Sequence, residues 1–280
     1  MDTHELIIKT KKRIWRKWSL AVKIFPIVLL ISILKYLSHN YGFEVMELNA
    51  LFSSLIAGTI FLIGFLISGV LTDYKESEKI PSEMSGILKS LFDDTLTIQG
   101  SKKTESAFRF LKFQQEFNVS LKEWFYKKER TSSILNKVSS MNDFFVEFDK
   151  EGIQANYIIK MKNEQNSLRK MILRIDTIRD TSFVGSAYAI VEAMGLLISF
   201  GLIIIKIEPF YASLFFTILV MFLITYMVFL VKDLDNPFDY SVKGERHSEI
   251  SLRPLHDCMQ VIDDFLKNYP EDRIQLMHKD

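Results

Sequence analysis

The chain has 280 residues, of which 48% are hydrophobic and 25% are charged, with a formal net charge of +1. Its mean hydropathy of +0.12 is high for a soluble domain and indicates that apolar residues are concentrated in a few segments. The near-neutral charge predicts no nucleic-acid partner. The single cysteine, Cys258, excludes an internal disulfide and a multi-cysteine metal site.

The first apolar segment, residues 24–34, is only 11 residues long and is flanked by Lys23 and Lys35. Lysine side chains can reach opposite membrane interfaces and lengthen such a span. We expect this segment to cross the membrane, and an interfacial helix is the alternative. It is preceded by two tryptophans suited to an interface, Trp15 and Trp18, and by a basic cluster of Lys9, Lys11, Lys12, Arg13, Arg16 and Lys17.

Three longer apolar segments follow. Residues 48–72 contain no charged residue and are long enough to cross a bilayer as a helix. Residues 183–205 are interrupted only by Glu192, and residues 210–231 carry no charge. The short polar turn at 206–209 joins the last two segments, so we expect them to form a helical hairpin.

The distribution of positive charge predicts the orientation of these spans. Residues 38–47, between the first two spans, contain no lysine or arginine, in contrast to the basic N-terminus. The N-terminus is therefore expected to be cytoplasmic, without a removed signal peptide. Four spans then place the C-terminus on the same side, and we expect four regions: residues 1–72, 73–182, 183–232 and 233–280.

Residues 73–182 are too polar for a membrane and too regularly patterned for disorder. Their apolar residues recur near helical spacing, with breaks at Gly100-Ser101 and Gly152. This pattern predicts a cytoplasmic bundle of three or four helices, and the spacing from Leu252 to Phe265 predicts a further amphipathic helix. The expected fold is an all-α membrane protein with four transmembrane helices and a helical bundle.

No enzyme signature, cofactor motif or metal-ligand pattern is present, so we predict neither catalysis nor a bound cofactor or metal. Glu192 is the one acidic residue inside a span, which raises the hypothesis of an intramembrane polar site. The alternative is a residue near a boundary or one that hydrogen-bonds a neighbouring helix. The sequence of the other spans indicates no ionisable partner for it.

The second span carries a continuous helical face formed by Ser54, Ala57, Phe61, Phe65, Ser68 and Thr72. Lipid requires neither hydroxyl groups nor small residues, so this face is expected to meet protein or water. In one interpretation the small residues allow close helix packing and the phenyl rings are core. In the other, several copies surround an axis and the rings form a hydrophobic constriction that gates by dewetting.

The same stretch resembles the second transmembrane helix of the bestrophins. In that family, Phe-x-x-Gly-Phe leads to Glu-x-Leu-Pro just past the membrane; here Phe61-Leu62-Ile63-Gly64-Phe65 is followed by Glu78 and Ile80-Pro81. Asn236-Pro237-Phe238, after the last span, is similar to the Asn-Pro-Phe that follows the fourth bestrophin helix. The order of spans, polar helical region, spans and tail also agrees.

The resemblance implies a ring-shaped homopentameric anion channel with the second helix lining its pore. Phe61 and Phe65 match the neck phenylalanines, and Ala57 stands where the family has a bulkier third neck residue, which implies a shorter or wider neck. Ser54, Ser68 and Thr72 would line the rest of this face. Animal bestrophins follow Asn-Pro-Phe with an acidic calcium-binding run, whereas residues 239–246 here are mixed in charge, so calcium gating is not expected.

The function predicted from the sequence is an anion channel, passing ions such as chloride, in the plasma membrane. Its partners would be the lipid bilayer, permeating anions and further copies of the chain. A membrane-anchored sensor or scaffold, whose cytoplasmic bundle binds a partner, is the alternative. A transporter that uses Glu192 is a third hypothesis, which the lack of broken-helix signals disfavours.

Overall fold

The computed structural model describes residues 3–180, 185–240 and 249–268, with side chains from Trp18 onward. The basic cluster before Trp18, Trp15, Phe183 and most of the segment 239–246 lie outside the described side chains. The chain forms two units. We call them the spanning unit, Met1–Tyr74 with Ser182–Pro237, and the bundle unit, Lys75–Thr181 with Phe238–Asp280.

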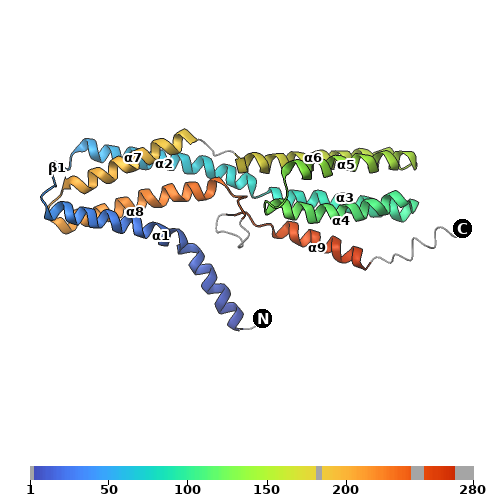
Figure 1. Cartoon of the computed structure of the whole chain (residues 1–280), viewed down its shortest axis with the longest axis horizontal. Helices are drawn as coiled ribbons and strands as arrows, with labels where there is room; N and C mark the ends of the chain where they lie inside the picture. The colour runs from blue at the N-terminus through green and yellow to red at the C-terminus, as the bar shows by residue number, and fades with distance from the viewer. Residues whose placement is uncertain (1–2, 181–184, 241–248, 269–280) are drawn as a thin grey trace. The chain divides into compact units, whose positions relative to one another are not determined.

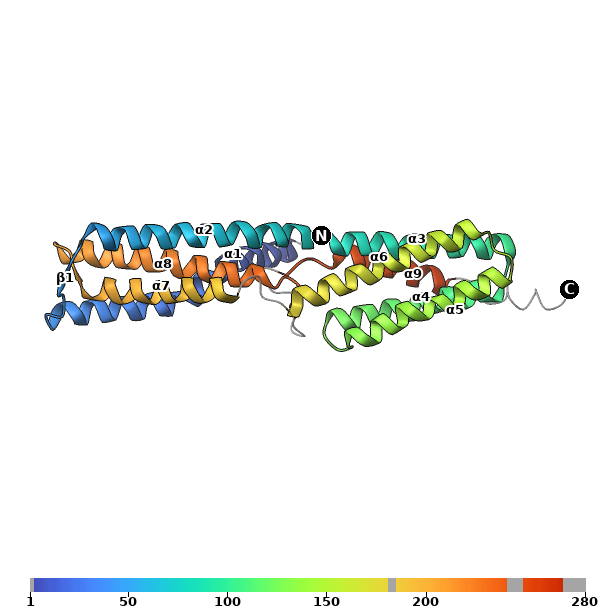
Figure 2. The same ribbon diagram turned by 90° about the horizontal axis from the view of Figure 1, so that it is seen from above.

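The spanning unit is built from four long helices that run side by side (Figures 1 and 2). The described residues contain four helices long and apolar enough to cross a membrane. The helices are α1 (Thr3–Asn40), α2 (Ala50–Ser77), α7 (Gly185–Ile204) and α8 (Phe210–Asp235).

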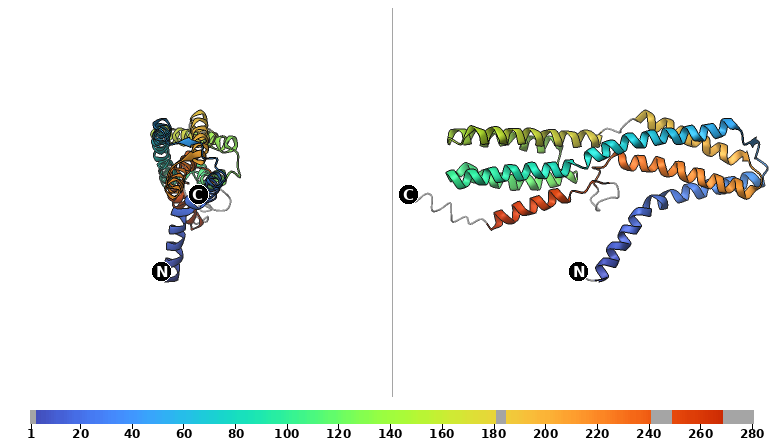
Figure 3. Two further views of the ribbon diagram at one scale, coloured as in Figure 1. Left: turned by 90° about the vertical axis from the view of Figure 1, so that its left-hand side faces the viewer. Right: turned by 180° about the vertical axis from the view of Figure 1, so that it is seen from behind.

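The first span is longer than its apolar core. The apolar part of α1 covers Trp18–Asn40, 23 residues, which corresponds to about 35 Å of helix against a hydrocarbon core of about 30 Å. The expected spanning length of the first segment is therefore confirmed. Pro26 lies inside this helix, where it removes a backbone hydrogen bond, and Figure 3 shows that α1 bends.

The core of the spanning unit joins all four helices. α1 packs against α7 and α8, and α7 packs against α8. Phe52, Ile63, Leu66 and Val70 of α2 join buried side chains of the other helices in one cluster. The ring of Phe52 lies over Gly201, so close that a Cβ atom there would be 2.3 Å from the ring.

A buried lysine connects the chain segments at one end of the spanning unit. Lys35 is 0% exposed, pairs with the Glu44 carboxylate at 2.6 Å and donates a hydrogen bond to the Ile205 carbonyl. His39 contacts the other Glu44 oxygen at 2.8 Å. Lys35 therefore has an internal set of partners, Glu44 and a carbonyl distant in sequence, and the prediction that its side chain reaches a membrane interface stays a prediction.

The same end carries a minimal sheet. β1 (Met46–Glu47) pairs in parallel with β2 (Ile205–Lys206). This pairing fixes the loop after α1 to the turn between α7 and α8. The fold is otherwise helical over the described residues, in agreement with the predicted class.

The bundle unit contains the four helices α3 to α6, the upper of the two numbers predicted. Each packs on the next and α6 packs back on α3, which closes a four-helix bundle (Figure 2). The predicted C-terminal helix is also present and packs on α3 and α4. The helices are α3 (Ile80–Lys102), α4 (Glu105–Phe125), α5 (Thr131–Lys150), α6 (Ala155–Asp180) and α9 (Arg253–Lys267).

Local sequence explains where these helices start and what they bury. Pro81 occupies the first turn of α3, where a missing N–H is harmless, and the Thr104 hydroxyl caps α4 by accepting from the Ala107 N–H. The core is rich in phenylalanine: the fully buried Phe110 ring contacts four other rings, those of Phe113, Phe144, Phe145 and Phe148.

Candidate functional site

The face predicted on the second span, which we call the α2 stripe, consists of Ser54, Ala57, Phe61, Phe65, Ser68 and Thr72. All six residues are exposed in the single chain. The Phe61 ring is 78% exposed and the Phe65 ring 70% exposed. The opposite face of α2, including Ile63 and Val70, is buried in the spanning unit. The two phenyl rings therefore do not form part of a core within one chain.

Small residues next to this stripe also face open space. A Cβ atom added at Gly58 or at Gly64 would meet no atom within 4 Å. Within a single chain, the close helix packing that these glycines permit is not used. Any such packing must involve another copy of the chain or another molecule.

The exposed face of α8 shows how different the α2 stripe is. On α8 the hydroxyl residues Ser213 and Thr217 are buried, and the exposed positions carry large apolar side chains, among them Phe215, Ile218 and Leu219. On α2 the exposed positions also include the hydroxyl residues Ser54, Ser68 and Thr72. α8 has the surface that lipid favours, whereas the α2 stripe does not.

The hydroxyl groups at the end of the stripe are partly satisfied by their own helix. The Thr72 hydroxyl donates to the Ser68 carbonyl at 2.9 Å. A hydroxyl that donates to the carbonyl four residues earlier still presents its oxygen lone pairs outward. This end of the stripe therefore offers acceptors and small dipoles, without a formal charge.

Glu192 has a partner that the sequence reasoning missed. Its carboxylate forms an ion pair with Lys232 of α8, and the two side chains are 46% and 51% exposed. Lys232 lies one residue beyond the apolar run 210–231, so an inspection confined to the uncharged spans could not find it. The pairing favours the second interpretation of Glu192, a polar residue that bonds a neighbouring helix.

The end of the Asn-Pro-Phe motif is anchored inside the bundle unit. The Phe238 side chain is 0% exposed, and its carbonyl accepts a hydrogen bond from Arg179 Nε at 3.3 Å. The Tyr240 hydroxyl, two residues on, donates to the Ile250 carbonyl at 2.6 Å. Asn236 and Pro237 precede this anchor in the spanning unit, and the Asn236 amide oxygen is buried.

Arg179 organises this region, and sequence reasoning did not single it out. It donates to the carbonyls of Trp124 at 3.3 Å and Phe125 at 2.9 Å, where the last turn of α4 leaves carbonyls without intrahelical partners. Its guanidinium lies 4.5 Å from the centre of a Trp124 ring. Burial lowers the pKa of Arg179, while Tyr240 and nearby aspartates oppose this shift.

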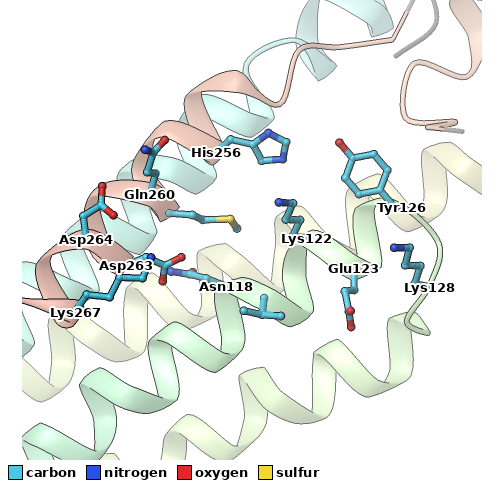
Figure 4. A pocket seen from close by; sticks show the side chains of 12 residues that line it. Asn118, Lys122, Glu123, Tyr126, Lys128, His256, Gln260, Asp263, Asp264 and Lys267 are labelled. Carbon is cyan, nitrogen blue, oxygen red and sulfur yellow. The ribbon is translucent and has the colours of Figure 1, made fainter. Parts of the chain in front are cut away.

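A groove of about 610 Å³ lies between α4 and α9 of the bundle unit (Figure 4). Side chains from both helices face one another across it, including Lys122 and His256. Asn118 lines the groove and is 3% exposed. Neither amide atom of Asn118 has a hydrogen-bond partner among the described residues, so the groove has an unused buried donor and acceptor.

The described residues contain no cluster of three or more metal-ligating side chains. The segment 241–248, which covers most of the position where animal bestrophins bind calcium, lies outside the described residues. The sequence expectation that calcium does not gate this chain therefore stays a prediction.

The sequence matches no protein-family model and none of the curated proteins, but solved structures match the fold. An isoleucine-to-threonine variant of a bacterial bestrophin homologue from Klebsiella pneumoniae aligns with a TM-score of 0.72 and 14% identity, over 88% of this chain and 100% of that chain. A leucine-to-threonine variant gives 0.71 and 14%, over 88% and 98%.

A further structure of the Klebsiella pneumoniae homologue, phased on zinc, aligns with a TM-score of 0.68 at 14% identity, over 89% of this chain and 100% of that chain. These alignments cover both units and nearly the whole of each homologue. The resemblance seen in the two short motifs is thereby confirmed at the level of the fold: this chain has the bestrophin fold.

Proposed function

We propose that copies of this chain assemble around an axis into an ion channel that passes anions such as chloride, with α2 of each copy lining the pore. The observation that carries the proposal is the mixed polar and aromatic surface of α2. Its exposed stripe combines hydroxyl and small residues with two phenyl rings, whereas the exposed face of α8 has large apolar side chains. A water-filled pore gives such a stripe a suitable environment.

Phe61 and Phe65 would form the neck of this pore. A ring of phenyl groups makes a narrow apolar passage that can gate by expelling water. Phenyl edges carry partial positive charge, so rings turned edge-on favour anions. Ala57, one turn away, would leave the neck open at its level, and Ser54, Ser68 and Thr72 would line the polar stretches on either side.

The assembly we propose is a homopentamer in the plasma membrane, with both termini in the cytoplasm. The support is the bestrophin fold, together with the basic N-terminal cluster and the absence of lysine and arginine from residues 38–47. The mass of the particle in detergent tests this stoichiometry. A monomer or dimer would contradict an axial pore.

The decisive experiment compares chloride flux in liposomes for the wild type and a Phe61→Ala, Phe65→Ala double variant. Removing the rings widens and wets the neck, so flux should rise even where the wild type rests closed. The matched control is Phe200→Ala, Phe215→Ala, which removes two rings that are 63% and 61% exposed on α7 and α8. Equal flux from both double variants would refute the proposal that Phe61 and Phe65 form the pore neck.

Selectivity requires a separate measurement. Reversal potentials in asymmetric potassium chloride should lie near the chloride equilibrium potential if the pore selects anions. A reversal potential near the potassium equilibrium potential would agree with an ion channel but would refute its selectivity for anions. The phenyl edges would then not determine which ion passes.

A second candidate is a membrane-anchored scaffold or sensor, and the groove beside Asn118 favours it. A buried amide with an unused donor and acceptor complements the amide group of a peptide or small ligand. This candidate predicts that Asn118→Leu abolishes ligand capture while leaving the particle mass unchanged. Flux that responds to the neck substitutions would favour the channel instead.

A further inference from the structure

A second groove lies within the spanning unit, between α1, α7 and α8. Its volume is about 370 Å³. Apolar side chains line most of its length, including Ile27 and Ile31 of α1, Leu196 of α7 and Val228 of α8. It extends along helices that are long and apolar enough to cross a membrane, so we expect it to face hydrocarbon.

One end of the groove is charged. Glu192 and Lys232, the ion pair between α7 and α8, both line it. Each side chain remains about half exposed, so the pair does not close off the groove. Lys232 is three residues from Asp235, the last residue of α8, which places this end near a membrane interface.

The ion pair has unused bonding capacity. An ammonium group has three donors, and a carboxylate has about four acceptor positions. The polar end of the groove therefore combines one carboxylate with one ammonium group, next to an apolar stretch of groove.

We propose that this groove binds a glycerophospholipid with a primary-amine headgroup, such as phosphatidylethanolamine. One acyl chain lies along the apolar walls, the headgroup ammonium donates to Glu192, and the phosphate accepts from Lys232. This occupant matches both charges of the pair and the apolar length below it. It also fills a surface that would otherwise lack contacts on one side.

The chemistry discriminates between lipid classes. A choline headgroup has no N–H and cannot donate to Glu192, and phosphatidylglycerol has no cation to offer that carboxylate. A hydrogen bond between charged groups favours the matching ligand by about tenfold or more. Phosphatidylethanolamine should therefore be retained over the other two by about that factor.

The test is native mass spectrometry of the full-length protein, released from detergent containing equal amounts of the three lipids with identical acyl chains. We expect the wild type to retain phosphatidylethanolamine about tenfold over the others, and Glu192→Gln to remove this preference. Equal retention of all three lipids by the wild type would overturn the proposal.

Two further variants test the groove itself. Gly195→Trp places an indole in the apolar part of the groove, where a Cβ atom would lie 3.7 Å from the Ile224 side chain. Leu196→Trp, at a position that is 71% exposed, obstructs the same part of the groove with less risk to folding. Leu197→Trp is the matched control, because this neighbour is 61% exposed and does not line the groove.

Loss of bound lipid in the Leu196→Trp variant, with normal retention in the Leu197→Trp variant, would support the groove. Equal loss or equal retention of bound lipid in the Leu196→Trp and Leu197→Trp variants would refute the groove as the binding site. Neither measurement depends on ion flux, so the result is independent of the channel proposal.

Discussion

Arg179→Met tests whether one guanidinium holds the end of α4 to the segment after the last span. The side chain donates to three carbonyls, at 2.9 Å to Phe125 and at 3.3 Å to Trp124 and Phe238. Methionine keeps much of the length and packing of the side chain but has no donor. The substitution therefore isolates the hydrogen bonds and the contact of the cation with the Trp124 ring.

The magnitude follows from the geometry. The bond to Phe125 has a favourable length and contributes about 1.5–3 kcal/mol, as is usual for a charged donor. The two longer bonds contribute less, since the Trp124 carbonyl also accepts from the Lys127 N–H, and the cation–π contact adds about 1 kcal/mol. Water can replace part of these interactions at a half-buried site, so we expect the substitution to lower the free energy of unfolding by about 3 kcal/mol.

The assay is thermal unfolding of the detergent-solubilised full chain, combined with hydrogen exchange. A loss of this size lowers the Tm of the bundle unit by about 6–12 °C, and exchange should accelerate around residues 122–126 and 238–240. The control is Arg174→Met on the same helix. Arg174 pairs with Glu76 at 3.1 Å, with side chains 53% and 67% exposed, and such pairs contribute about 0–1 kcal/mol. Equal effects of the two substitutions would refute the role of Arg179.

Three further predictions concern other parts of the chain. Gly201→Ala should lower the unfolding free energy by about 1–3 kcal/mol because its Cβ meets the Phe52 ring, and Phe52→Leu in the same chain should recover part of this in thermal unfolding. Burial raises the pKa of Glu44, but His39 and Lys35 outweigh it and hold the pKa below its ordinary value of 4.5. Because the folded-state pKa is the lower one, this stabilisation is complete above pH 4.5 and is lost as the pH falls through the folded value, so Tm should fall there in the wild type and less in Glu44→Gln. Asn118→Leu should raise the Tm of the purified protein, because it removes a buried amide that has no partner among the described residues; a lower Tm would contradict this reasoning.

The spans and the bundle were predictable because their signals are local. An uninterrupted apolar run such as 48–72 has few alternatives to a membrane helix, and helical spacing in residues 252–265 identifies the buried face of α9, where Leu255, Met259 and Ile262 are buried. The exposed stripe on α2 follows from the same periodicity. In each case the residues that determine the structure lie within a few turns of one another.

The partners of charged residues could not be predicted in this way. Lys35 is buried because Glu44 and the Ile205 carbonyl surround its ammonium group, and that carbonyl is 170 residues away. Arg179 contacts carbonyls 54 and 59 residues away. Helical spacing identifies which face a residue occupies, but it does not identify the distant backbone group that meets it.

The polar residues within the spans lead to a stronger constraint on function when they are taken together. Lys35 and Glu192 have charged partners inside the chain, and the buried Thr59 and Thr217 donate to carbonyls of their own helices. These residues are explained by the single chain. Ser54 and Ser68 on the α2 stripe are different, because they are exposed beside two exposed phenyl rings. A single copy in lipid would place small and hydroxyl groups against hydrocarbon on the one helix that could instead carry leucine and isoleucine, as α8 does. An assembly that turns this face toward water or toward further copies of the chain removes that cost.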